Sequence, residues 1–122
     1  MTARAILLTL AMIAAVVPAG AHPAPFSYVD LVVRPDGIEG TLVVHVLDLA
    51  HDLGIDAPER LLEPAEIARR REAILALLAP RIGLLVDGDE ARVEWTTIAP
   101  APERDALRLG FRLALPAPGP KP

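Results

Sequence analysis

Residues 106–115, ALRLGFRLAL, carry the clearest structural signal in the chain. Leu107, Leu109 and Phe111 alternate with positions that include Arg108 and Arg112. This period of two is typical of a β-strand that packs on one face and meets water on the other. The segment therefore predicts a one-sided antiparallel sheet.

Two hairpins are expected around this strand. Residues 26–34 and 38–47 are rich in Val and Leu and are separated by Pro35-Asp36-Gly37, a sequence typical of a tight turn. His45 would then lie inside the second strand. Residues 82–86 and 91–98 flank the sequence DGDE at 87–90, which predicts a second hairpin with Asp-Gly at its turn. These acidic residues lack the ligand spacing of a calcium loop, so we interpret them as turn residues.

One helix is expected between the hairpins, at about residues 64–79. It begins at Pro64, contains no glycine and ends before Pro80. The three arginines at 69–71 would occupy its solvated face, since Glu66 and Glu72 flank them. Residues 48–64 are interrupted by glycine and proline, which predicts an irregular connection with one short helical turn near residues 57–62.

The expected fold is mainly β, antiparallel and sandwich-like, with one inserted α-helix. Five strands are expected, whereas a sandwich normally has about seven. The domain is therefore either a small partial sandwich or part of a chain that continues beyond Pro122. Residues 116–122 hold four prolines and are interpreted as a tail or linker.

The first 21 residues resemble a secretory signal peptide. Arg4 precedes an apolar run at residues 5–17, and small residues follow up to Ala21, after which cleavage is expected. The apolar run is thirteen residues long, whereas a membrane-spanning helix needs about 20 apolar residues, so a cleaved signal peptide is favoured. An uncleaved anchor is the alternative interpretation. We expect residues 22–115 to form a β-rich periplasmic or extracytoplasmic domain.

Composition narrows the possible functions. The net charge of −4 does not favour nucleic acid as a partner, and the absence of cysteine excludes disulfides and thiolate chemistry. The sequence contains no nucleophile elbow, phosphate-binding loop, dinucleotide fingerprint or His-Glu-x-x-His pair. We therefore expect a protein that is not an enzyme.

The three histidines, His22, His45 and His51, provide the one chemical signal. Cleavage after Ala21 would give His22 a free α-amine, so its amine and imidazole could chelate one metal ion. A second imidazole, from His45 or alternatively His51, would complete a histidine brace, a nitrogen-rich set that suits copper best and otherwise nickel. Asp52 could add an oxygen ligand or orient an imidazole.

Structural roles compete with this interpretation. His45 on a strand is equally consistent with a hydrogen-bonded side chain, and Asp52 with a capping residue at a turn or helix start. Trp95 and Tyr28 are interpreted as packing residues rather than as carbohydrate platforms.

Three segments carry a family resemblance, namely the mature start HPAPFSYVDL at 22–31, GTLVVH at 40–45 and LAHDLG at 49–54. They resemble the extracytoplasmic N-terminal domain of bacterial membrane proteins of the HupE/UreJ type. The resemblance implies a signal peptide, a β-rich periplasmic domain that opens with histidine, a following bundle of transmembrane helices and a link to nickel or copper handling. No apolar run of about 18 residues follows Val17, so the resemblance makes this chain a fragment that carries only the soluble domain.

The leading hypothesis is a periplasmic, non-enzymatic domain that binds copper or nickel within a membrane-associated metal-handling protein. The alternative is a structural or interaction module that docks a membrane partner without metal. A redox enzyme built on a histidine brace is a third hypothesis, for which the sequence offers no substrate surface.

Overall fold

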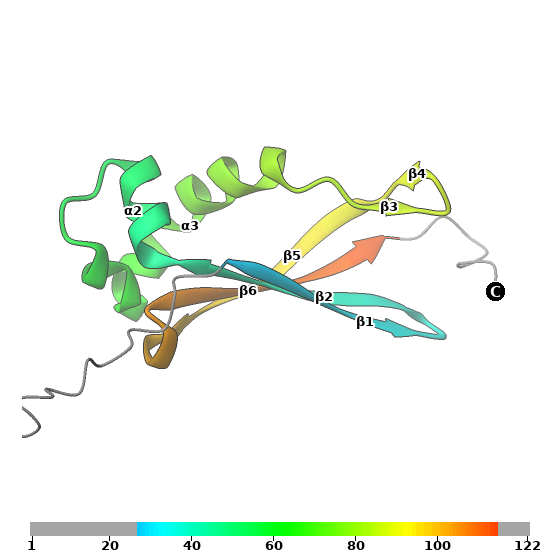
Figure 1. Cartoon of the computed structure of the whole chain (residues 1–122), viewed down its shortest axis with the longest axis horizontal. Coiled ribbons are helices and arrows are strands. Elements are labelled where there is room, and N and C mark those ends of the chain that lie inside the picture. Colours follow the sequence, from blue (N-terminus) through cyan, green and yellow to red (C-terminus); the bar gives the residue numbers. More distant parts are fainter. Residues whose placement is uncertain (1–26, 115–122) are drawn as a thin grey trace, which may run out of the picture.

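A computed structural model describes residues 27–114 of the chain. Its centre is a four-stranded antiparallel sheet with the strand order β1-β2-β6-β5, in which β2 and β6 are the inner strands (Figure 1). The strands are β1 (Tyr28–Arg34), β2 (Gly37–His45), β5 (Arg92–Ala101) and β6 (Ala106–Ala114). The expected mainly β, antiparallel architecture is confirmed.

Helices pack on one face of this sheet (Figure 1). The α-helices are α2 (Val46–Leu53) and α3 (Pro64–Leu78), and the short 3-10 segments are η1 (Pro58–Leu62), η2 (Ala79–Arg81) and η3 (Pro102–Arg104). The expected main helix is confirmed as α3, and the expected helical turn near residues 57–62 corresponds to η1. The other described strands, β3 (Leu85–Val86) and β4 (Asp89–Glu90), form a separate small pair. The sandwich-like arrangement stays a prediction.

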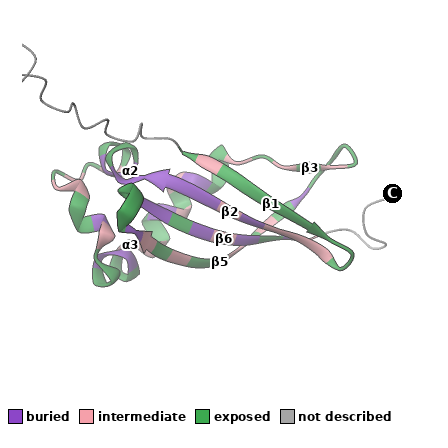
Figure 2. Cartoon of the chain, turned by 60° about the horizontal axis from the view of Figure 1, so that its bottom comes forward, coloured by how far each residue is buried: buried purple, intermediate pink, exposed green. Residues whose placement is uncertain are grey.

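The core lies between the helices and the inner strands. On β6, Leu107, Leu109 and Phe111 are buried and contribute to this core, whereas Arg108 and Arg112 are exposed. The alternation in residues 106–115 therefore marks the two faces of the sheet correctly. Figure 2 shows that the burial is concentrated on β2 and β6 and that the outer strand β1 is largely exposed.

Glycine and aromatic residues face one another across the inner strands. Gly40 on β2 is opposite Phe111 on β6, and a Cβ atom at Gly40 would collide with the Phe111 ring. Trp95 on β5 meets the same ring edge-on, with ring centroids 5.5 Å apart. The aromatic residues are thus packing residues of this face, as expected for Trp95.

The expected irregular connection after residue 47 is wrong. Residues Val46–Leu53 form α2, which buries Val46, Leu49 and Ala50 and ends at Gly54 in the left-handed conformation (φ 67°). The helical spacing of these apolar residues outweighs the glycine and proline interruptions, since Gly54 terminates the helix and does not break it. The second strand also ends two residues earlier than expected, at His45.

The expected hairpin of residues 82–86 with 91–98 is only partly correct. Asp87 and Gly88 form the two-residue turn, both with positive φ, but the strands it joins are only two residues long. One further backbone bond, from Ala91 N–H to the Leu84 carbonyl at 2.8 Å, extends the pairing. The long strand β5 pairs instead with β6, because its apolar residues complete the core on that side.

The first hairpin has the expected antiparallel pairing, from Tyr28 opposite Val43 to Arg34 opposite Gly37. Because β1 and β6 are both antiparallel to β2, they run in the same direction. Ser27 and Ala114, the first and last described residues, therefore lie at opposite ends of the sheet.

Candidate functional site

His45 connects β2 to α2 and caps the helix. Its backbone is extended (φ −67°, ψ 136°), and its ring Nδ1 accepts a hydrogen bond from the Leu47 backbone N–H at 3.3 Å. The side chain thereby satisfies one of the N–H groups that the first turn of a helix leaves without a partner. An Nδ1 atom that accepts a bond carries no proton, so the neutral ring holds its proton on Nε2.

The beginning of β1 lies beside His45. The His45 backbone N–H donates to the Ser27 hydroxyl oxygen at 3.4 Å. The strand that follows His22 in the sequence thus pairs with the strand that holds His45, as expected. His22 itself lies outside the described residues, as does the expected signal peptide.

His51 and Asp52 lie in the last turns of α2, and both are exposed. The Asp52 carboxylate forms an ion pair with the Arg81 guanidinium, which links α2 to the segment after α3. This pair gives Asp52 a partner other than a metal ion. Within residues 27–114, no group of three or more histidine or acidic side chains is placed to hold a metal.

Among the described residues, the most concentrated charge cluster surrounds Glu66, whose sequence position suggested only that it flanks the arginines at 69–71. Glu66 is 6% exposed, and its carboxylate accepts hydrogen bonds from Arg60 at 2.8 Å, from Arg69, and from Arg70 Nε at 3.0 Å. Arg69 and Arg70 follow Glu66 by three and four positions, a spacing that brings helix side chains together. That spacing is the signal that would have identified the cluster.

The arginines lower the pKa of the Glu66 carboxyl below its ordinary value of 4.5. The largest cause is the hydrogen bond from Arg69, followed by the bond from Arg70. Burial acts in the opposite direction, and the charge of Arg60 lowers the pKa further. Both carboxylate oxygens of Glu66 accept hydrogen bonds from arginines on its own helix, α3, or on η1. We therefore interpret this cluster as a structural clamp that joins η1 to α3.

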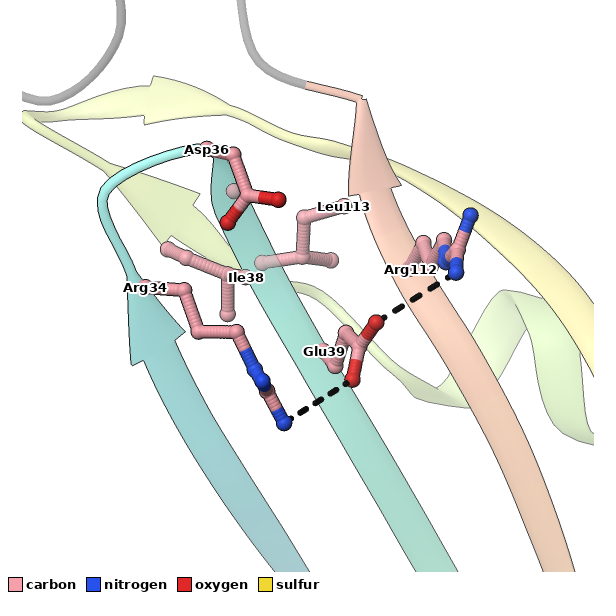
Figure 3. Close-up of a pocket in the computed structure, with 7 residues that line it drawn as sticks. Arg34, Asp36, Ile38, Glu39, Arg112 and Leu113 are labelled. Carbon is pink, nitrogen blue, oxygen red and sulfur yellow. Dashed lines mark hydrogen bonds and ion pairs between the residues drawn. The ribbon is translucent and has the colours of Figure 1, made fainter.

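The face of the sheet opposite the helices carries a row of charges near the first hairpin turn. Glu39 lies between Arg34 and Arg112, with oxygen to nitrogen distances of 3.7 Å and 3.4 Å (Figure 3). These side chains are all roughly half exposed, and ion pairs of this kind contribute only about 0–1 kcal/mol each. The pocket that these three side chains help to line, drawn in Figure 3, is therefore a solvated surface feature.

Among the described residues, the exposed large apolar side chains of the four-stranded sheet all lie on β1. Val29, Leu31, Val32 and Val33 are 42%, 47%, 50% and 68% exposed. Val29, Leu31 and Val33 are paired with Leu42, Gly40 and Ile38, so they share the face on which the helices pack. No described helix covers them, because the helical layer packs on the three other strands.

Comparisons with known proteins gave no relative. No family model, no curated protein and no solved structure matches the chain. Within the described part of the chain, the helices are all too short or too polar to cross a membrane.

Proposed function

We propose that the chain is an exported, non-enzymatic interaction module whose working surface is the free edge of β1. The observation that carries this proposal is the exposure of four aliphatic residues on one outer strand. Soluble proteins usually protect such an edge with inward charges, proline or a bulge. The seven residues of β1 contain no proline and pair with β2 without a register shift.

The backbone of β1 supports the same proposal. The hairpin closes at Arg34 and Gly37, so Arg34 and every second residue before it bond to β2. The N–H and C=O groups of Val29, Leu31 and Val33 consequently point away from the sheet. An added strand would gain affinity from these groups and specificity from its side-chain contacts.

Site-specific photocrosslinking in cells tests this proposal. A benzophenone amino acid at Val33 should crosslink the whole chain to a second polypeptide, because Val33 lies on the free edge. The same group at Leu85, which is 70% exposed on the β3–β4 pair, is the matched control and should give little crosslinking. Equal yields from both positions would refute a function of the β1 edge.

Export and a membrane setting belong to the same proposal. They are supported by the leader-like residues 1–21 and by the resemblance of residues 22–54 to the extracytoplasmic domain of HupE/UreJ-type membrane proteins. N-terminal sequencing of the chain recovered from the periplasm should begin at His22. Recovery of the uncleaved chain in the cytoplasm would contradict export.

Binding of copper or nickel is a second candidate function. It is favoured by the position of Ser27 beside His45, since five extended residues span at most about 17 Å and His22 is five residues before Ser27. The amine and imidazole of His22 would then share a metal ion with His45, or with His51 and Asp52 as alternative ligands.

The bond between His45 and Leu47 makes this second candidate sharply testable. To bind a metal through Nε2, the neutral His45 ring would have to move its proton to Nδ1 and release the Leu47 N–H. Copper binding at His45 should therefore increase amide hydrogen exchange at the start of α2. Exchange that stays unchanged at saturating copper would exclude His45 as a ligand through Nε2.

The role of the terminal amine is tested separately by titrating copper into protein that begins at His22 and into a version with one extra residue before it. The brace predicts weaker binding by the extended version, because its His22 has no free amine. Equal affinity of the two versions would refute the brace.

A further inference from the structure

We infer that the partner of the β1 edge is the β1 edge of a second copy of this chain, so that two sheets join into one continuous sheet. This inference rests on the proposed function of β1 and names its occupant. The evidence is that the sequence of β1, YVDLVVR, is complementary to itself when it is read antiparallel.

A two-fold axis at Val32 gives the pairing that best uses this strand. Leu31 would then lie opposite Val33 of the second copy, and Val33 opposite its Leu31. Both residues belong to the set whose backbone groups point away from the sheet, so these pairs would also exchange the main-chain hydrogen bonds. On the helix-facing side, the exposed leucine and valine side chains would cover one another.

The opposite face supplies the charge complementarity. In the same register, Asp30 lies opposite Arg34 of the second copy, and the symmetry repeats this pair on the other side of the axis. Within the described residues Asp30 has no ion pair, and Arg34 has only the exposed contact with Glu39 at 3.7 Å. Opposite charges directly across an antiparallel pair stabilise the pairing, whereas like charges in the same positions destabilise it.

Neighbouring registers are poorer. An axis at Leu31 would place Asp30 opposite Val32 and would leave both charges without a partner. An axis at Asp30 would place two aspartates opposite each other, which is destabilising. An axis at Val33 would place Asp30 opposite Asp36 of the second copy, which sets like charges against each other and leaves Arg34 without an acidic partner.

Sedimentation equilibrium of the purified protein tests the dimer. We expect a monomer–dimer equilibrium at concentrations up to about 1 mM, at which a dimer with a dissociation constant of about 1 mM would be well populated. Leu31→Pro should abolish the dimer, because it removes an outward N–H while leaving the bonds to β2 in place. Leu31→Ala is the matched control, which keeps the N–H and should retain a measurable dimer.

A charge exchange tests the register without proline. Asp30→Arg or Arg34→Asp alone should weaken the dimer by about tenfold, since each places two like-charged pairs across the axis. The double variant Asp30→Arg/Arg34→Asp should restore the original affinity. Circular dichroism of each variant establishes that the fold is intact.

The outcomes separate this inference from the function on which it rests. A protein that is monomeric at every concentration, or a dimer that is insensitive to both sets of substitutions, would overturn the inference. Crosslinks from Val33 to a different polypeptide would then leave the proposed function in place. Absence of both the dimer and the crosslinks would overturn both.

Discussion

Gly40 is the residue at which the packing of the sheet tolerates the least change. The Phe111 ring occupies the space where a side chain at position 40 would lie. The ring in turn packs against Trp95, which restricts its movement. A methyl group at Gly40 would therefore require the aromatic pair to shift.

We expect Gly40→Ala to lower the free energy of unfolding by about 1–3 kcal/mol, the usual cost of overpacking a core. Gly83→Ala is the matched control. No atom lies within 4 Å of a Cβ at that position, and its backbone is not in the left-handed region. Urea denaturation of both variants measures the difference, and equal stability of the two would contradict the role assigned to Phe111.

His45 shows the limit of sequence reasoning at the scale of single residues. Its place at the end of the second strand, beside the strand that follows His22, could be predicted from the hairpin pattern. Its use of Nδ1 as a helix cap could not, because the helix that it caps was not expected. A capping role requires knowing where the next helix begins, and histidine is not among the residues that usually mark that position.

At the scale of elements, α2 is the main feature that the sequence did not predict. Its eight residues include apolar positions at helical spacing, but glycine and proline follow closely and the segment is short. Short apolar runs are difficult to assign by periodicity alone. By contrast, α3 has fifteen residues with a proline at its first position, and its boundaries were predicted to within one residue.

The Glu66 clamp joins η1 to α3, and its effect should depend on pH. Because the folded-state pKa of Glu66 is lowered, its contribution to stability is present above pH 4.5 and is lost as the pH falls through the folded-state pKa. Glu66→Gln removes the charge that Arg60, Arg69 and Arg70 share.

We therefore expect Glu66→Gln to be less stable than the natural chain at pH 7, and the difference to shrink as the pH falls below 4.5. Urea denaturation at a series of pH values measures this. Glu72→Gln, an exposed change on the same helix, is the matched control and should show no such convergence. A stability difference that is independent of pH would mean that the clamp does not act through the charge of Glu66.

At the scale of the whole molecule, the sheet and the helices share one main core. It extends from β2 and β6 through Leu61 in η1 to Ile67, Ile74 and Leu78 in α3. The alternation of residues 106–115 predicted the core face of β6, but the sequence did not predict that β5 would pair with it. That pairing depends on contacts between distant segments, which local patterns do not encode.

Leu109→Ala should destabilise the whole domain by about 2–5 kcal/mol, since this side chain is fully buried on a central strand. Leu85→Ala removes the same atoms from a side chain that is 70% exposed and should change the stability by less than about 0.5 kcal/mol. Circular dichroism and Trp95 fluorescence followed during denaturation should report a single shared transition. Two separate transitions would show that the helical layer unfolds independently of the sheet.

The parallel course of β1 and β6, on either side of β2, has a mechanical consequence. The described chain enters at one end of the sheet and leaves at the other, about seven strand residues or roughly 23 Å away. A pulling force applied to the two ends would load both ladders along their length, so that many backbone bonds would have to break together. The described domain should therefore resist tension that is applied between its first and last described residues.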